Sequence, residues 1–256
     1  MDESTTRELA DRTLLFGRFN VARDYHMGVF IICIIPVGTF VCLRVLAFSP
    51  VVLELYSYST MLVLTCFIIL LCVLSEWTVV SLFLCDPGFT DAAEDEGAYR
   101  CPLCRIYVKE YDHHCGILGV CIGERNMGFF LSFLTFVSFL MWLFVWFAGV
   151  SLMSWLRKAV AHRSLYEGLL LLLKEWWFSS KIKPVTFVLF ILLCYGALFT
   201  TMLGIFYWCM LCRGMLSLER RRKPSLRMNS RAVFCHMWRP SLSRTALLHR
   251  NAGNEV

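Results

Sequence analysis

The sequence predicts an all-α polytopic membrane protein with four transmembrane helices and a small loop domain between helices 2 and 3. Three observations support this fold class. Hydrophobic residues make up 58% of the 256 residues, and the mean hydropathy is +0.62, which is high for a soluble domain. The apolar residues form four runs, each long enough to cross a hydrocarbon core of about 30 Å. Cys and His residues gather between the second and third runs.

The first two spans are expected within residues 28–85. Residues 28–47 carry one charge, Arg44, and follow a mixed-charge segment, 1–27, that lacks a small-residue cleavage site. The second span, 61–84, contains Glu76 about two turns from its end at 1.5 Å per residue. A carboxyl group at that depth faces either the interior of the helix bundle or the headgroups.

The last two spans are expected within residues 127–212. Asp86-Pro87-Gly88 ends the second helix, because Pro cannot continue it and Gly allows a tight turn. Residues 129–155 and 185–212 are nearly continuous apolar runs. The apolar run in the connection between them is too short to cross the membrane. Its mix of aromatic and basic residues predicts a lumenal segment that lies at the membrane interface.

The charge distribution predicts the orientation. The tail, residues 213–256, holds ten Lys and Arg residues against two acidic residues. The positive-inside rule places such a tail in the cytosol. Four crossings then also place residues 1–27 and the loop 86–126 in the cytosol. A five-span alternative would export the basic tail, so four spans are favoured.

The thirteen cysteines fall into two groups. Several stand singly in apolar runs, where a thiol behaves as a small hydrophobic side chain. Cys101 and Cys104 instead form a Cys-x-x-Cys pair, with His114 and Cys121 close behind. Two thiolates of a Cys-x-x-Cys pair bind one tetrahedral ion, and a structural zinc site needs two further nitrogen or sulfur ligands. Because a reducing cytosol disfavours disulfides, these four residues predict a zinc site.

A second set of residues in the same loop predicts nucleophilic catalysis. Asp112 next to His113 can orient the imidazole and stabilise its protonated form, and Cys115 follows two residues later within reach of that base. The neighbouring histidines can have different roles if their side chains point in different directions. An alternative remains open, since Cys115 can itself be a zinc ligand and the loop holds five candidate ligands for four positions.

Residues 101–129 resemble the cysteine-rich domain of the DHHC protein S-acyltransferases, also called palmitoyltransferases. The shared motifs are Cys101-x-x-Cys104, Asp112-His113-His114-Cys115, Cys121-Ile122-Gly123 and Asn126-x-x-Phe129. Asp86-Pro87-Gly88 matches a tripeptide that the family carries after its second span. Leu216–Glu219 stands where the family has Thr-Thr-x-Glu, and the stretch from Asn229 to Pro240 resembles the C-terminal motif of the family.

The resemblance implies a role for each matching residue. Asp112 and His113 would activate Cys115, which takes a fatty acyl group from acyl-CoA as a thioester and passes it to a protein cysteine. The expected zinc ligands are Cys101, Cys104, His114 and Cys121. The tail residues that would support the site are Ser217, Glu219 and Asn229. The hydroxyl of Ser217 would contact Asp112.

This chain also departs from the family pattern. The family has a second zinc site, but here Arg100 and Tyr107 occupy the positions of its His and one Cys, and its Cys-x-x-Cys is missing. We therefore predict one zinc ion per chain. Gly116-Ile117 replaces the usual Pro-Trp after the nucleophile, and Leu216 replaces the first Thr of the tail motif, which removes rigidity near Cys115.

The leading interpretation is a protein S-acyltransferase that uses acyl-CoA, with Arg125 and Lys109 as candidate cations for the CoA phosphates. Membrane lipids and cysteine-containing membrane or peripheral proteins are the expected partners, and no nucleic acid is expected. The expected location is an endomembrane, the Golgi or the endoplasmic reticulum, with the plasma membrane as an alternative. The second interpretation is a catalytically weak membrane adaptor or chaperone that binds partners through the zinc loop. A channel or transporter is disfavoured, because Glu76 is the one acidic residue deep in a span.

Overall fold

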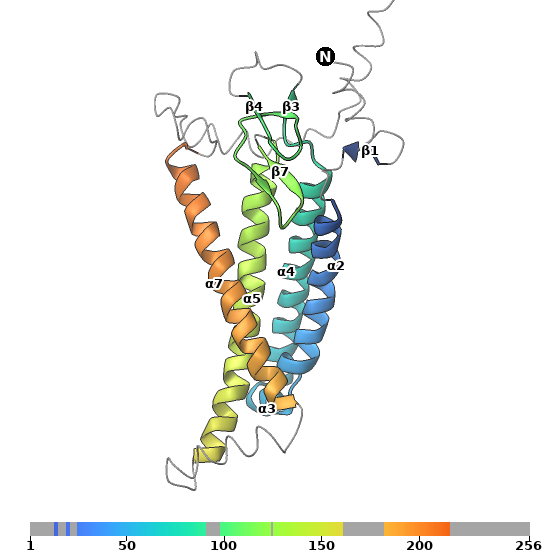
Figure 1. The fold of residues 1–256 in the computed structure, drawn as a ribbon. Helices are drawn as coiled ribbons and strands as arrows, with labels where there is room; N and C mark the ends of the chain where they lie inside the picture. The colour runs from blue at the N-terminus through green and yellow to red at the C-terminus, as the bar shows by residue number, and fades with distance from the viewer. Residues whose placement is uncertain are drawn as a thin grey trace, which may run out of the picture. The chain divides into compact units, whose positions relative to one another are not determined.

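The structure is a computed structural model, drawn as a ribbon in Figure 1. It describes residues 13–14, 19–20, 25–90, 98–123, 125–160 and 182–215. The interfacial segment predicted between the third and fourth spans therefore lies largely outside the described residues. The basic tail and its three predicted supporting residues, Ser217, Glu219 and Asn229, also lie outside them.

Four long helices contain the four predicted spans (Figure 1). They are α2 Tyr25–Cys42, α4 Tyr58–Leu84, α5 Met127–Val160 and α7 Ile182–Cys212. A π-helical turn, η1 Leu43–Ala47, completes the first span. The segments long and apolar enough to cross a membrane are Tyr25–Ala47, Tyr58–Leu84, Met127–Ser154 and Val185–Cys212. The predicted fold class and number of spans are confirmed for the described part of the chain.

Large apolar side chains are exposed along these helices. Phe40 is 66% exposed, Val63 67% and Met202 64%. Water-soluble monomers rarely expose apolar surface on this scale, whereas the hydrocarbon core of a bilayer would cover it. The exposure therefore agrees with helices that face lipid.

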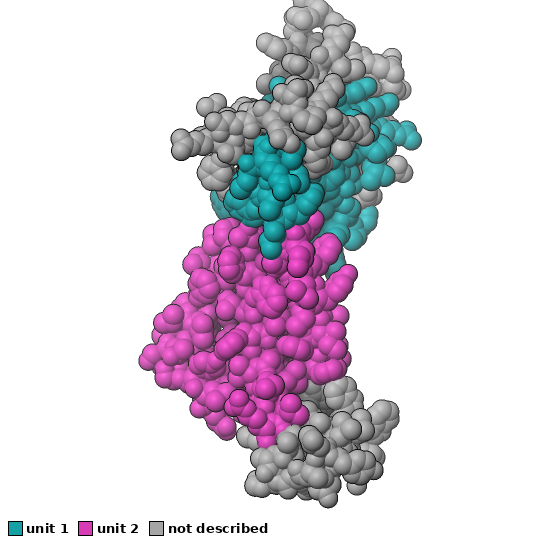
Figure 2. Space-filling model, turned by 90° about the vertical axis from the view of Figure 1, so that its left-hand side faces the viewer, with its two compact units in different colours: residues 1–34, 76–133, 204–256 teal, residues 35–75, 134–203 magenta. Residues whose placement is uncertain are grey.

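The chain forms two compact units, coloured separately in Figure 2. Unit 1 comprises residues 1–34, 76–133 and 204–256, and unit 2 comprises residues 35–75 and 134–203. Each long helix contributes residues to both units. The Cys and His residues of interest all belong to unit 1.

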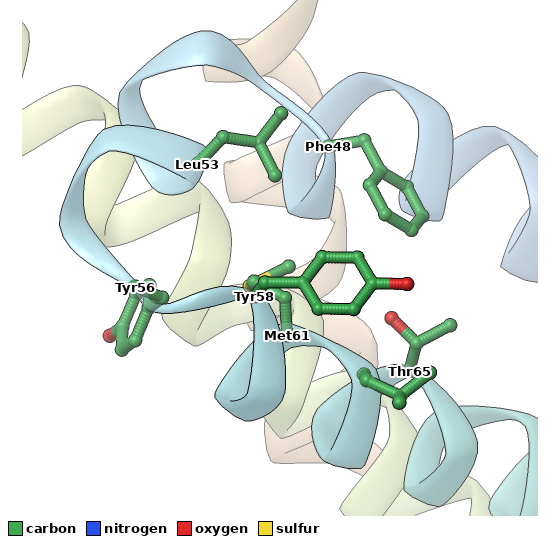
Figure 3. A pocket seen from close by; sticks show the side chains of 7 residues that line it. Phe48, Leu53, Tyr56, Tyr58, Met61 and Thr65 are labelled. Carbon is green, nitrogen blue, oxygen red and sulfur yellow. The ribbon is translucent and has the colours of Figure 1, made fainter.

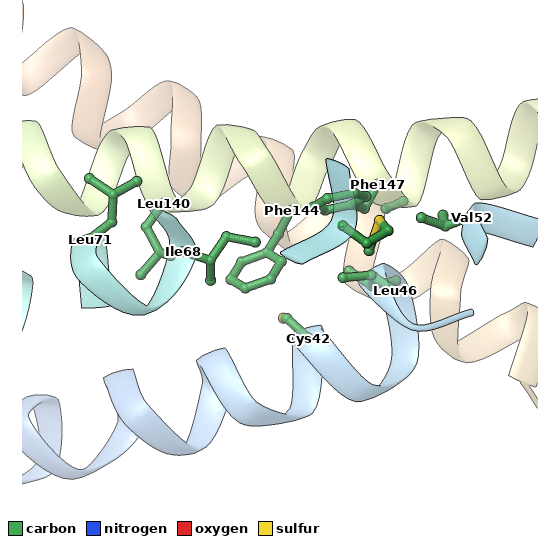
Figure 4. Close-up of a cluster of buried hydrophobic side chains, with 11 residues drawn as sticks. Cys42, Leu46, Val52, Ile68, Leu71, Leu140, Phe144 and Phe147 are labelled. Atoms are coloured by element: carbon green, nitrogen blue, oxygen red, sulfur yellow. The ribbon is translucent and has the colours of Figure 1, made fainter. Parts of the chain in front are cut away.

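Unit 2 has a hydrophobic core in which Phe147, Leu46 and Ile68 are fully buried (Figure 4). Polar side chains link its helices at the edges of this core. The indole N–H of Trp146 donates a hydrogen bond to the hydroxyl of Tyr56 over 3.0 Å. Such pairs satisfy polar groups that lipid cannot.

A short helix that the sequence did not predict, α3 Pro50–Leu55, lies in the connection between the first two spans. Pro50 suits its first turn, where the missing N–H is not needed. Beside it is a pocket of about 390 Å³, shown in Figure 3. Seven residues line the pocket: Phe48, Leu53, Tyr56, Tyr58, Met61, Leu62 and Thr65. This pocket belongs to unit 2, which does not contain the cysteine cluster.

Short antiparallel strands organise the loop in unit 1. The strands β3 Phe89–Thr90, β5 Tyr107–Lys109 and β4 Ala98–Arg100 form a sheet in the order β3-β5-β4. The strands β6 His113–Cys115 and β7 Val120–Ile122 form a separate hairpin. A two-stranded pair near the N-terminus, β1 Thr13–Leu14 and β2 Phe19–Asn20, completes the described strands.

Candidate active site and metal centre

Cys101 and Cys104 lie in the tight turn that joins β4 to β5. The Cys101 N–H donates to the carbonyl oxygen of Ile106 over 3.0 Å, and the Arg105 N–H donates to that of Cys101 over 2.8 Å. The Cys104 N–H points at the Cys101 sulfur, 3.4 Å away. Arg105 turns the chain with a φ of 59°. This turn places both thiols on the same side.

The β6–β7 hairpin presents the remaining chemistry on its two faces. His114 lies opposite Cys121 in the register, while His113 lies opposite Ile122 and Cys115 opposite Val120. Because successive side chains of a strand point to opposite faces, His114 and Cys121 share one face, and His113 and Cys115 share the other. The strand therefore directs the two neighbouring histidines to opposite faces, as different roles for them require.

The face with His114 and Cys121 completes a four-residue cluster with Cys101 and Cys104. Their ligand atoms all lie within 4.8 Å of one another. His114 Nδ1 is 3.4 Å from the Cys104 sulfur and 3.5 Å from the Cys121 sulfur, and those two sulfurs are 3.6 Å apart. A tetrahedral zinc site with ordinary bond lengths has edges of about 3.6–3.8 Å. The cluster therefore has the size of a site that could hold a metal ion.

The electrostatics of the cluster also fit a cation. Hydrogen bonds from Cys104 and Cys121 lower the pKa of Cys101, whereas hydrogen bonds to Cys101 and Cys104 raise the pKa of Cys121. Three buried sulfurs this close cannot all be anionic unless a cation lies among them.

The positions expected for a second zinc site form a cross-strand pair instead. Arg100 lies opposite Tyr107 in the pairing of β4 with β5, and the Arg100 Nε donates to the Arg105 carbonyl oxygen over 3.1 Å. Nearby, the rings of Tyr99 and Tyr111 stack with centroids 5.2 Å apart. Among the described residues, the four-residue cluster is the one group of three or more potential ligands. The prediction of one zinc ion per chain stays a prediction.

The opposite face of the hairpin carries His113 and Cys115, and Asp112 lies immediately before β6. Asp112 is 4% exposed, and its Oδ2 lies 2.6 Å from Nδ1 of His113. With a carboxylate at that distance, Nδ1 carries the proton and Nε2 is left for the thiol. Cys115 is partly exposed, and its interaction with His113 raises the pKa of the imidazole. The structure thus brings the three predicted catalytic residues together.

The environment of His113 favours its protonated form. Burial alone would lower the pKa of the imidazole, but hydrogen bonds and charge from Asp112 and Cys115 outweigh it and raise the pKa to about 9. The arrangement suits a cysteine nucleophile paired with a histidine.

Tyr207 of α7 joins this group and was not identified from the sequence. Its hydroxyl donates a hydrogen bond to Asp112 Oδ2 over 2.8 Å and lies 3.1 Å from His113 Nδ1. Phe130 of α5 packs its ring edge-on against both His113 and Tyr207. A tyrosine near the end of a span is an ordinary feature of membrane helices, so no local signal distinguishes Tyr207.

Asn126 and Gly123, which belong to the motifs noted in the sequence, hold the hairpin in place. Asn126, at 0% exposure, accepts a hydrogen bond from the Gly123 N–H over 2.9 Å and donates one to the Cys121 carbonyl over 2.8 Å. Gly123 is needed because a Cβ there would lie 2.5 Å from the Pro87 carbonyl oxygen. Asp86 Oδ1 accepts from the backbone N–H groups of the two residues after Pro87, which fixes the turn that enters the loop.

The two candidate cations for CoA have different surroundings. Arg125 forms an ion pair with Asp86, at 3.1 Å, and its side chain is 42% exposed. Lys109 donates its backbone N–H to the Gly88 carbonyl oxygen, and it is exposed. The role of these two cations in CoA binding stays a prediction.

Comparison with known proteins gives consistent matches. A family model described as DHHC palmitoyltransferase matches residues 89–224, which is more than half of the chain. Palmitoyltransferase ZDHHC14 of Mus musculus is 37% identical over 78 residues, 30% of this chain and 14% of that protein. Palmitoyltransferase ZDHHC3 of Rattus norvegicus is 26% identical over 151 residues, 54% of this chain and 45% of that protein. The chain thus spans less than half the length of these relatives.

Proposed function

The chain belongs to the DHHC palmitoyltransferase family, and on this premise we propose that it is a protein S-acyltransferase with Cys115 as its nucleophile. It would transfer a long-chain fatty acyl group from acyl-CoA to cysteines of other proteins. The observation that carries the proposal is the contact of Asp112 with His113, which shares one face of the β6–β7 hairpin with Cys115, while the candidate metal ligands His114 and Cys121 share the other face.

The reaction proceeds through two thioester exchanges. In the first, Nε2 of His113 takes the proton of Cys115, and the thiolate attacks the acyl carbonyl of acyl-CoA. The bond to the CoA sulfur breaks, and CoA leaves with the proton that His113 returns. In the second, a substrate cysteine loses its proton to His113 and attacks the acyl-enzyme, and the Cys115 sulfur leaves. Asp112 stabilises the imidazolium in both exchanges.

The proposed metal is one structural zinc ion held by Cys101, Cys104, His114 and Cys121. When bound, it would neutralise the thiolates and fix the loop, and it takes no part in the chemical steps. The alternative in which Cys115 is a zinc ligand is disfavoured by the strand register. Cys115 is paired with Val120, whereas His114 is paired with Cys121 on the other face.

The proposed setting is a multi-pass endomembrane protein, in the Golgi or the endoplasmic reticulum, with the loop and both termini in the cytosol. The acyl chain would lie among the helices, where burial contributes about 0.8 kcal/mol per methylene group, while CoA stays in the cytosol. Arg125 and Lys109 remain the proposed cations for its phosphates. The protein substrates would be membrane or peripheral proteins that bring a cysteine to the membrane surface.

Labelling with an alkyne-tagged fatty acid tests the activity. Wild-type protein should acquire a label that hydroxylamine removes, and Cys115→Ala should not. Cys212→Ala is the matched control, because Cys212 is an exposed thiol at the end of α7 that could acquire a label without being the nucleophile. Equal labelling of the wild type and Cys115→Ala, or no labelling of either, would refute the proposed function.

A second candidate function is a membrane adaptor with weak catalysis. The observation that favours it is the pair Gly116 and Ile117 next to the nucleophile. Both are exposed, and a Cβ added at Gly116 would meet no atom within 4 Å. An adaptor role should survive Cys115→Ala and be lost with Cys101→Ala, which removes a candidate metal ligand. An enzymatic role should be lost with both.

A further inference from the structure

The hydroxyl of Tyr207 and the imidazole of His113 meet at the same carboxylate oxygen. Oδ2 of Asp112 lies 2.8 Å from the Tyr207 hydroxyl and 2.6 Å from His113 Nδ1. The Asp112 side chain is fully buried. Water therefore does not solvate this carboxylate group, and donors from the protein must stabilise its charge.

The ring of Tyr207 also limits the movement of the imidazole. It stacks on His113 at 5.9 Å with an angle of 29° between the planes. Phe130, which is 2% exposed, contacts both rings edge-on at 5.5 and 5.1 Å. His113 is thus held by its carboxylate partner on one side and by two aromatic rings from two helices.

The hydroxyl cannot serve as the base or the nucleophile in this position. It is directed at Asp112 Oδ2 and His113 Nδ1, and its proton is engaged in the hydrogen bond to the carboxylate. Simple packing does not explain the hydroxyl, since a Phe ring at the same place would keep every ring contact. The hydrogen bond to Asp112 is what a tyrosine adds.

We propose that Tyr207 is a positioning residue for the acyltransfer site, which holds the Asp112 carboxylate and thereby the orientation of the His113 imidazole. The inference rests on the proposed function of Cys115. It makes the end of the fourth span part of the active site, although Tyr207 lies 95 residues from Asp112 in the sequence. The site is then assembled from three elements: the hairpin with Asp112, α5 with Phe130 and α7 with Tyr207.

Tyr207→Phe tests the proposal, with Tyr195→Phe as the matched control. Tyr195 lies on the same helix and is 72% exposed, so loss of its hydroxyl should leave the rate unchanged. Tyr207→Phe should lower the maximal rate of Cys115 acylation by about tenfold, the scale of one hydrogen bond to a charged group. The acyl-CoA concentration at half-maximal rate should not change, because the hydroxyl does not touch the substrate.

A double-mutant cycle with Asp112→Asn separates positioning from general stability. If Tyr207 acts through Asp112, adding Tyr207→Phe to Asp112→Asn should lower the acylation rate by less than about twofold. An equal loss in both backgrounds would mean that Tyr207 only stabilises the fold. A wild-type rate for Tyr207→Phe would also overturn the proposal.

A second measurement keeps the test independent of acyl transfer. Alkylation of Cys115 by iodoacetamide at neutral pH, followed by mass spectrometry of its peptide, reports the reactivity of the thiol without acyl-CoA. Tyr207→Phe should slow this alkylation several-fold, and Tyr195→Phe should not. If the wild type acquires no acyl label, the proposed function fails, and the alkylation rates still decide whether Tyr207 positions the His113 and Cys115 pair.

Discussion

The substitution Asn126→Ala should loosen the candidate metal centre without touching a ligand. Asn126 is 0% exposed, and its amide bridges the N–H of Gly123 and the carbonyl of Cys121. Alanine removes both partners at once. It leaves a buried donor and a buried acceptor next to a candidate metal ligand, where water cannot easily replace the lost amide.

The size of the effect follows from these two bonds. A buried polar group left without a partner costs about 1–3 kcal/mol, so two such groups destabilise the folded loop by about 2–6 kcal/mol. If folding of the loop is coupled to metal binding, the same free energy is lost from the affinity for zinc. At about 1.4 kcal/mol per factor of ten, the affinity should fall by at least about 30-fold.

Competition with a chelator of known affinity measures this loss on purified protein in detergent. Ser132→Ala is the control, in the first turns of α5, the helix that follows Asn126. Ser132 is also buried, at 6% exposure, but its hydroxyl donates only to the Gly128 carbonyl one turn earlier. This control should change the affinity less than about fivefold. A wild-type zinc affinity for Asn126→Ala would refute the bridging role of this amide.

Three further predictions concern the same loop. Metal analysis of purified protein should give one zinc ion per chain, and Cys104→Ser should bring it close to zero; two ions in the wild type would contradict the predicted stoichiometry. Gly123→Ala should lower the thermal unfolding midpoint by several degrees, because its Cβ would lie within 3 Å of a backbone carbonyl oxygen. Gly116→Ala is the control and should leave the midpoint unchanged, because a Cβ at Gly116 would meet no atom within 4 Å. Arg125→Met should cost less than about 1 kcal/mol of stability, as a partly exposed ion pair does. If Arg125 also binds CoA, the same variant should raise the acyl-CoA concentration at half-maximal acylation.

The membrane fold was predictable because it depends on composition over long segments. Four apolar runs gave four spans, and the start of each helix lies within three residues of its expected place. The short helix α3 was missed, because six residues carry too little periodicity to identify a helix. The four candidate metal ligands were predictable as well, since Cys-x-x-Cys with a nearby His and Cys is a local pattern.

The catalytic surroundings were predictable only in part, and the reason is sequence distance. Asp112, His113 and Cys115 are neighbours in the chain, so their proximity is almost guaranteed. The β6–β7 register could not be read from the sequence, because strands of three residues leave no clear alternation of apolar and polar side chains.

Tyr207 was harder still to find, since α7 has another tyrosine, Tyr195, in an equally apolar setting. Only the tertiary fold shows that Tyr207 is 7% exposed and contacts Asp112, whereas Tyr195 is 72% exposed. A residue that acts through a long-range hydrogen bond leaves no local pattern. In this chain Gly116-Ile117 stands where the family has Pro-Trp after the cysteine. The contacts that constrain His113 therefore come from Tyr207 and Phe130, which belong to helices rather than to the loop.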